Sequence, residues 1–177
     1  MNVLKGKYVL LYGLIILAVL SRLVPHPANF TPVAALGVFA GAYLSDRRYW
    51  LIPLAAVLIS DIFIGFYNPV AMLFVYLGFA VSAVIGRMLL LEKRNAILLG
   101  SSALVSAVVF FVFSNLGVWL AGLYYPMTMA GLVQCYVMAI PFFGNTLFGD
   151  IFYVVILFGI YEAVQILMLR QQGIRAV

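Results

Sequence analysis

The chain has 177 residues, of which 67% are hydrophobic and 8% are charged, and its formal net charge is +5. With a mean hydropathy of +1.19, this composition excludes an ordinary soluble domain and indicates a polytopic membrane protein. A chain of this length has room for about six membrane helices of roughly 20 residues each, which leaves no separate soluble domain.

Apolar runs predict six helices, and prolines mark several of the joins between them: Pro25 and Pro27, then Pro69, then Pro126. The second and third helices are short for a hydrocarbon core of ~30 Å. The predicted helices cover residues 8–24, 30–44, 50–66, 70–91, 96–124 and 146–169, with a long connection before the last one. We therefore predict an all-α integral membrane fold, a compact bundle of about six transmembrane helices in one domain, residues 1–177.

Lys5 and Lys7 before the first apolar run are also typical of a cleaved signal peptide. Ser21, Arg22 and the prolines that follow do not form a small-residue cleavage site. We therefore expect the first run to remain as a helix.

Basic residues fall at the two termini and at alternate connections, which by the positive-inside rule are cytoplasmic. Both termini are then cytoplasmic. The positive net charge is explained by these cytoplasmic residues and does not require a nucleic-acid partner. The three opposite connections contain no Lys or Arg, and Arg22 is the one exception to this asymmetry. The cytoplasmic set is Lys5, Lys7, Arg47, Arg48, Arg87, Lys93, Arg94, Arg170 and Arg175.

Three acidic residues lie within apolar runs, where carboxylates usually face a bundle interior or a water-filled cavity. The topology puts Asp61 and Asp150 in the outer half of the membrane together with Arg22 and His26, which predicts a polar chamber open to the outside. The third acid, Glu162, lies nearer the cytoplasmic end. The candidate substrate-binding residues are Arg22, Asn29, Asp61, Asn115, Asn145 and Asp150 for polar contacts, with Trp119 and Tyr125 stacking on the ligand.

Structural alternatives stand beside each of these assignments. Asp150 is also explained as a first-turn acid of a helix that Asn145 and Thr146 cap, and Asp61 as half of an ion pair with Arg22. Trp119 and the tyrosines also suit an interfacial aromatic belt. The remaining structural readings are that His26 is solvated and that Cys135 fills apolar space. In the same way, Glu162 would be neutralised by Arg87 or by Arg47 and Arg48.

Small residues four apart allow helices to approach closely in lipid. Gly37 and Gly41 form such a pair in the second helix, and Gly78, Ser82 and Gly86 form a ridge in the fourth. Gly144 and Gly149 flank the start of the predicted last helix. We expect these residues to pack a compact bundle.

The sequence does not favour an enzyme. With a single histidine and no phosphate loop or zinc-ligand spacing, it lacks the usual catalytic motifs. An intramembrane aspartyl protease would need Asp61 and Asp150 close enough to share a proton, and a channel would need an oligomer. No cofactor is expected.

Two segments carry a family resemblance: NFTPVAALGVFAGAYLSDRRYWLIPLAAVLISDIFIGF, ending at Phe66, and AIPFFGNTLFGDIFY, ending at Tyr153. They resemble an uncharacterised bacterial family described as transport proteins. More distantly, the helix pattern resembles the S components, the substrate-binding subunits, of energy-coupling factor (ECF) transporters. That resemblance implies an outward-facing site for a vitamin-like nutrient and docking to energising subunits. The alanine patch that serves docking in those subunits is reduced here to Gly13 and Ala18, so the chain is also compatible with working alone.

We therefore expect a multi-pass protein of the bacterial inner (cytoplasmic) membrane that captures a small micronutrient from the outer face, aromatic, heterocyclic or corrinoid. The corrinoid is considered because His26 and Cys135 offer soft metal ligands. The alternative is a structural or assembly membrane protein whose acids only form ion pairs.

Overall fold

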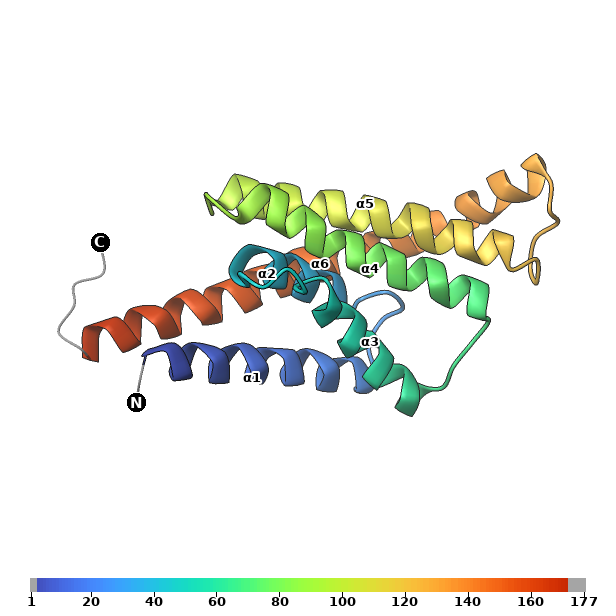
Figure 1. Cartoon of the computed structure of the whole chain (residues 1–177). Coiled ribbons are helices and arrows are strands. Elements are labelled where there is room, and N and C mark those ends of the chain that lie inside the picture. Colours follow the sequence, from blue (N-terminus) through green and yellow to red (C-terminus); the bar gives the residue numbers. More distant parts are fainter. Residues whose placement is uncertain (1–2, 172–177) are drawn as a thin grey trace.

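The protein is a bundle of six α-helices, as a computed structural model of residues 3–171 shows (Figure 1). The first five predicted helices are confirmed to within five residues at either end. The helices are α1 (Val3–Leu23), α2 (Val33–Tyr43), α3 (Leu51–Ile64), α4 (Pro69–Leu90), α5 (Ala96–Leu120) and α6 (Met129–Gln171).

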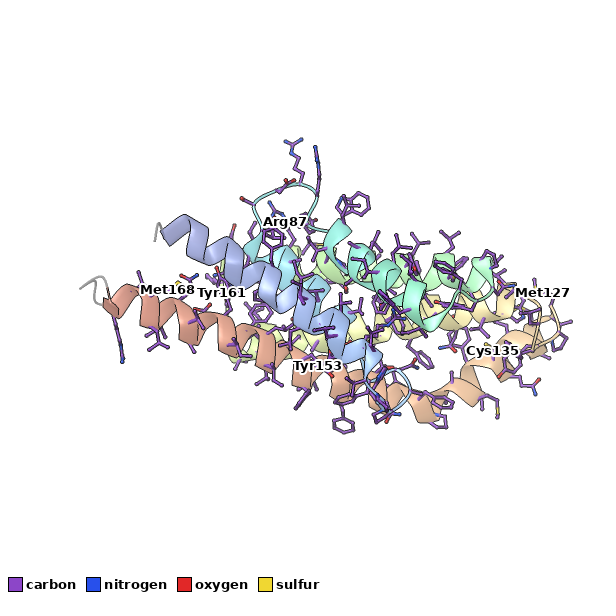
Figure 2. The ribbon with its side chains drawn as sticks, turned by 90° about the horizontal axis from the view of Figure 1, so that it is seen from below. Arg87, Met127, Cys135, Tyr153, Tyr161 and Met168 are labelled. Atoms are coloured by element: carbon purple, nitrogen blue, oxygen red, sulfur yellow. The ribbon has the colours of Figure 1, made fainter. Side chains whose placement is uncertain are left out.

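The sixth helix differs from the prediction, because the expected long connection is itself helical. α6 contains 43 residues, which corresponds to a length of about 65 Å. It begins after Thr128, whose Oγ1 accepts the backbone N–H of Gly131 at 3.1 Å, as an N-cap does. Pro141 lies inside the helix, and Figure 2 shows that α6 bends along its course. The prediction was wrong because Asn145 and Thr146 were read as the cap of a helix that begins there, whereas the helix already runs through this segment and through Pro141, which membrane helices tolerate.

Within residues 3–171, three helices are long and apolar enough to cross a membrane: Pro69–Leu90, Ala96–Leu120 and Met129–Arg170. By contrast, α2 has 11 residues and α3 has 14. At 1.5 Å per residue they are about 16 and 21 Å long, well short of a ~30 Å hydrocarbon core. The composition and these three helices together identify a membrane protein.

The short helix α2 lies at the centre of the bundle, and all its residues from Val33 to Ala42 are buried. Small residues make this burial possible. A Cβ atom added at Gly41 would collide with the carbonyl oxygen of Ala83 in α4, and one added at Gly86 with that of Val38 in α2. Gly37 faces Ser82 in the same way. The predicted close packing is thus confirmed for Gly37, Gly41, Ser82 and Gly86 at the α2–α4 crossing. It is wrong for Gly144, where an added Cβ would meet nothing within 4 Å.

Figure 1 shows that α1 begins, α6 ends and α4 connects to α5 at the same end of the molecule, and Arg87, Lys93, Arg94 and Arg170 lie at these chain positions. Arg87 donates to the carbonyl of Leu44 at 2.7 Å, and Arg94 donates to that of Ala42 at 3.0 Å. These bonds tie the α2–α3 loop and the α4–α5 connection to one side, as the charge pattern predicted. Arg175 lies outside the described residues.

Glu162 has a different partner from the predicted arginines. It accepts a hydrogen bond from the hydroxyl of Tyr43, and the guanidinium of Arg94 lies over the Tyr43 ring at 4.3 Å. Arg87 instead contacts the Tyr49 ring at 4.9 Å. In Figure 2, Arg87 and Tyr161 mark this end, while Met127 and Cys135 mark the opposite end.

Candidate ligand-binding site

A buried ion pair lies where α1 ends against α3. The guanidinium of Arg22 contacts Asp61 Oδ1 at 2.8 Å. The same nitrogen donates to the carbonyl of Val57 at 3.1 Å and to the hydroxyl of Ser60. Asp61 is 1% exposed and Arg22 is 14% exposed, so the pair is largely out of solvent. The predicted structural pairing of these two residues is therefore present.

The second oxygen of Asp61 also has a partner, because the hydroxyl of Tyr76 in α4 donates to Oδ2 at 2.8 Å. Both carboxylate oxygens are thus compensated, which a buried charge requires. α3 ends just beyond this acid: Gly65 donates to the Asp61 carbonyl at 2.8 Å and has a φ of 107°, which glycine adopts readily. This turn leads the chain to Tyr67.

Two adjoining cavities lie beside the ion pair. The larger has a volume of about 240 Å³ and the smaller about 140 Å³. They share four lining residues, Asn29, Tyr67, Val75 and Phe110. Arg22 and Thr31 line only the smaller cavity, while Ser114, Asn115 and Thr146 line only the larger. We treat the two adjoining cavities as one candidate site, with Arg22 in its wall and Asp61 behind Arg22.

Asn29 reaches both cavities because of the turn that carries it. Phe30 donates its backbone N–H to the carbonyl of Pro27 at 3.0 Å, and Asn29 has a φ of 63°. Asparagine is among the few residues other than glycine that adopt this left-handed conformation readily. The α1–α2 loop thus presents a side-chain amide to the cavities.

The far wall of the larger cavity comes from α5 and α6. The Nδ2 of Asn115 donates to the carbonyl of Phe111 at 2.8 Å, which leaves its Oδ1 as an acceptor. Thr146 Oγ1 donates to the carbonyl of Phe142 at 3.2 Å. The remaining wall is mainly aromatic, with Phe110, Phe111 and Phe142. This mixture of apolar surface and a few polar groups is typical of small-molecule sites.

The charges around the cavities balance. The one cationic lining side chain, Arg22, is paired with Asp61, and the other polar lining groups are neutral amides and hydroxyls. Partial burial raises the pKa of the Tyr67 phenol to about 12, and the nearby Asp61 carboxylate adds to this shift. Tyr67 is therefore neutral at physiological pH, and the site suits an uncharged ligand.

Five of the eight candidate residues line neither cavity: Asp61, which lies behind Arg22, and Trp119, Tyr125, Asn145 and Asp150. Trp119 donates its indole N–H to the carbonyl of Pro126 at 3.0 Å and so anchors the α5–α6 loop. Tyr125 belongs to that same loop. Asn145 and Asp150 lie inside α6, so the prediction that Asn145 and Thr146 cap this helix is wrong. Asp150, 21 residues after the first residue of α6, is not a first-turn acid.

The two soft metal-ligand candidates have other contacts. His26 is exposed, and its Nδ1 lies 2.7 Å from the carbonyl oxygen of Val24. Cys135 is buried, and its thiol lies 3.4 Å from the carbonyl oxygen of Asn115. Within the part of the chain that the structure describes, no three His, Cys, Asp or Glu side chains form a group that could hold a metal ion.

Sequence reasoning missed several residues of this region. Tyr76 is one of eleven tyrosines, and its bond to Asp61 depends on the rotation of α4 about its axis. Phe110 and Phe111 sit in an unbroken apolar run. A usable signal existed for Tyr67, because it lies in an outer connection only six residues after Asp61.

Comparison with known proteins gives a family and no closer parallel. No curated protein matches the chain, and no solved structure does. One family, described as a family of unknown function (DUF6580), matches residues 3–172. Because the match covers nearly the whole sequence, the chain belongs to this family.

Proposed function

We propose that the protein binds a small, uncharged aromatic or heterocyclic nutrient in the paired cavities and takes part in its uptake across the membrane. The observation that carries the proposal is the composite wall: a left-handed Asn29, the acceptor of Asn115 and the aromatic side chains surround the same space. Polar groups held at fixed positions against apolar surface are how such sites obtain specificity.

The size of the site limits the ligand. A cavity of ~150 Å³ accommodates benzene, so the larger cavity, about 240 Å³, suits a monocyclic or bicyclic molecule. The adjoining cavity of about 140 Å³ leaves space for one polar substituent near Arg22. A corrinoid is far larger than these volumes, and we leave it out of the proposal.

Arg22 supplies the polar contact for that substituent. The contacts of Arg22 with Val57, Ser60 and Asp61 all use Nη1, whereas a guanidinium has five N–H donors. The remaining donors favour a carbonyl or ring nitrogen on the ligand. Because Asp61 already balances the positive charge, a second carboxylate on the ligand is not required.

The orientation follows from the charge pattern. We place the cavities on the outer side of a bacterial inner membrane and both chain ends in the cytoplasm, because the basic loops lie at the opposite end from Arg22. The chain is multi-pass in this arrangement, with α2 and α3 buried by their neighbours. An S-component-like role with energising subunits and solitary operation are both compatible with it.

A second candidate function is structural, and the ion pair favours it. Asp61 and Arg22 satisfy one another with Tyr76 and Ser60, so both charges are explained without a ligand. In that case the cavities hold only water, and the protein serves membrane assembly.

Native mass spectrometry of protein extracted in mild detergent separates the two. We expect a bound molecule of the mass of a monocyclic or bicyclic heterocycle, which is lost from Asn29→Gly and Asn115→Leu. Asn29→Gly removes the amide while keeping a residue suited to φ 63°. Val108→Leu, on an exposed part of α5, is the matched control and should keep the molecule.

The structural alternative predicts a different result. Wild-type protein would then carry no molecule beyond lipid and detergent, and Asn29→Gly and Val108→Leu would behave alike. Thermal unfolding of each variant shows whether a lost adduct reflects the site or a damaged fold.

A further inference from the structure

Asp150 is a buried carboxyl group without a compensating partner. It is 3% exposed, and its Oδ2 makes no hydrogen bond. It lies in the middle stretch of α6, near Tyr153 (Figure 2). Ser106 Oγ, on the adjacent helix α5, is buried and unpartnered as well. Asp61, by contrast, has an arginine and a tyrosine on its two oxygens.

The elements that pack against α6 are α1, α2, α5 and, through Phe30, the α1–α2 loop, and within residues 3–171 none of them offers Asp150 a free cation. In that loop the ionisable side chain is His26, which is exposed and has its Nδ1 2.7 Å from the carbonyl oxygen of Val24. α5 contains no ionisable side chain. The only one in α2 is Tyr43, which donates to Glu162 near the basic end. In α1, Arg22 is held by Asp61, Tyr12 is exposed, and Lys5, Lys7 and Tyr8 lie in its first turns. Within α6 itself the ionisable residues are Cys135, Tyr136, Tyr153, Tyr161, Glu162 and Arg170, which include no cation near Asp150.

An ionised carboxylate in such surroundings is strongly unfavourable, because burial removes it from bulk solvent and no described side chain brings it a positive charge. The neutral carboxylic acid is far easier to bury. Acids of this kind inside membrane helices are typical of proton relays. The burial and the missing partner therefore point to a proton on Asp150.

This group lies behind the wall of the larger cavity. Thr146, one helical turn earlier on the same face of α6, lines that cavity, and so does Phe142, one turn earlier still. A Cβ atom added at Gly149 would lie 3.1 Å from the Cα of Phe30, the residue that follows Asn29. Water that enters the cavity is thus the nearest acceptor for a proton leaving this side chain.

We propose that Asp150 is a proton-binding site linked to the cavity: it holds a proton while the cavity wall is closed and releases it to water when the wall opens. The O–H bond of the carboxylic acid breaks, the carboxylate stays on α6, and water in the cavity takes the proton. The proton itself is inferred from the burial of Asp150 and the lack of a cation around it. Only its link to the cavity rests on the proposed ligand site.

Infrared spectroscopy of the full chain in lipid tests the proton directly and needs no ligand. We expect the C=O stretch of a protonated carboxyl group at pH 7 in the wild type, absent in Asp150→Asn and retained in Glu162→Gln, the matched control. No such band at pH 7, or a band that survives Asp150→Asn, overturns the proposal.

Two further measurements keep the test decisive if Asp150→Asn folds poorly. Phe142→Ala widens the cavity, and in this variant the carboxyl band should disappear at a lower pH than in the wild type. If the band disappears at the same pH in both, the link to the cavity is overturned. Replacing choline by Na⁺ at constant ionic strength should leave the band unchanged. A band that Na⁺ abolishes shows a cation site and overturns the proton. A failed ligand search in mass spectrometry would leave these results unaffected.

Discussion

Asp61 and Asp150 are two aspartates of similar burial, 1% and 3% exposed, in opposite electrostatic surroundings. Asp61 lies on α3 between Arg22 and Tyr76, and both of its oxygens are engaged. Asp150 lies on α6 among helices that bring it no free positive charge, and its Oδ2 is unpartnered. Burial alone therefore does not decide the role of an acid.

The difference has a physical origin in the helix ends. α1 ends at Leu23, so the long side chain of Arg22 is placed to reach α3 at the rim of the bundle. α6, by contrast, extends on both sides of Asp150, so this side chain lies among packed helices and not at a helix end. An acid at a helix rim finds a counter-ion more readily than one in mid-helix.

The largest effect is expected when the paired acid loses its counter-ion. Arg22→Leu leaves a buried carboxylate without compensation, which costs ~3–5 kcal/mol of stability. Chemical unfolding in detergent should show this loss. Combining Arg22→Leu with Asp61→Asn should recover a large part of it, because a neutral amide then replaces the charge. A double variant as unstable as Arg22→Leu alone would show that the guanidinium acts through packing and that the pair has little electrostatic weight.

Neutralising each aspartate in turn should have opposite effects. Asp61→Asn weakens the contact with Arg22, and we expect a loss of ~1–3 kcal/mol, limited because Arg22 is 14% exposed and borders a cavity. Asp150→Asn should leave stability at pH 7 unchanged or raise it, because the amide needs no proton to be neutral. Thermal unfolding at pH 5 and pH 8 checks this. The advantage of Asp150→Asn should be greater at pH 8, because the aspartate is ionised in the unfolded chain at both pH values and the free-energy cost of protonating it on folding grows with each pH unit above its unfolded pKa of ~3.9. Equal losses for both variants would contradict the contrast between the two acids.

The bond from Tyr76 gives a smaller effect. Tyr76→Phe removes a hydrogen bond to a buried carboxylate, and such bonds contribute about 1.5–3 kcal/mol. Because Arg22 still compensates the charge, the loss should fall toward the lower value. Tyr12→Phe, at a tyrosine that is 62% exposed, is the control and should change stability by less than ~0.5 kcal/mol. Unfolding curves that coincide for the two variants would mean that Tyr76 does not stabilise Asp61.

Most of the fold could be predicted from the sequence because hydropathy and loop charge both act along the chain. They locate α1 to α5, and the spacing of Gly37, Gly41 and Gly86 indicates the surfaces that pack closely. The start of α6 could not be found in this way. Pro141, Gly144 and Asn145 resemble a helix break, yet that segment is helical and belongs to a helix that packs against α5.

The candidate site was less accessible to sequence reasoning. Arg22 stood out as the basic residue on the wrong side of the charge pattern, and its pairing with Asp61 follows from the need to compensate a buried acid. Which aromatic residues line the cavities depends on helix rotation, which hydropathy does not fix. For this reason Trp119 and Tyr125 were expected at the ligand, whereas Tyr67, Phe110 and Phe111 line the cavity instead.

The smallest stability effect is expected at Tyr67, which borders both cavities and lies near the paired acid. Tyr67→Phe should change the free energy of unfolding by less than ~0.5 kcal/mol, because the residue is 42% exposed. With a pKa of about 12, the phenol of the folded chain stays neutral up to pH 10, whereas in the unfolded chain it ionises near the ordinary tyrosine value of ~10. The variant and the wild type should therefore show the same pH profile of stability from pH 5 to about pH 9, and only the wild type should lose this stability above about pH 10. A profile that differs near pH 9 would mean that Tyr67 ionises within this range and that the Asp61 carboxylate and partial burial do not hold its proton in place.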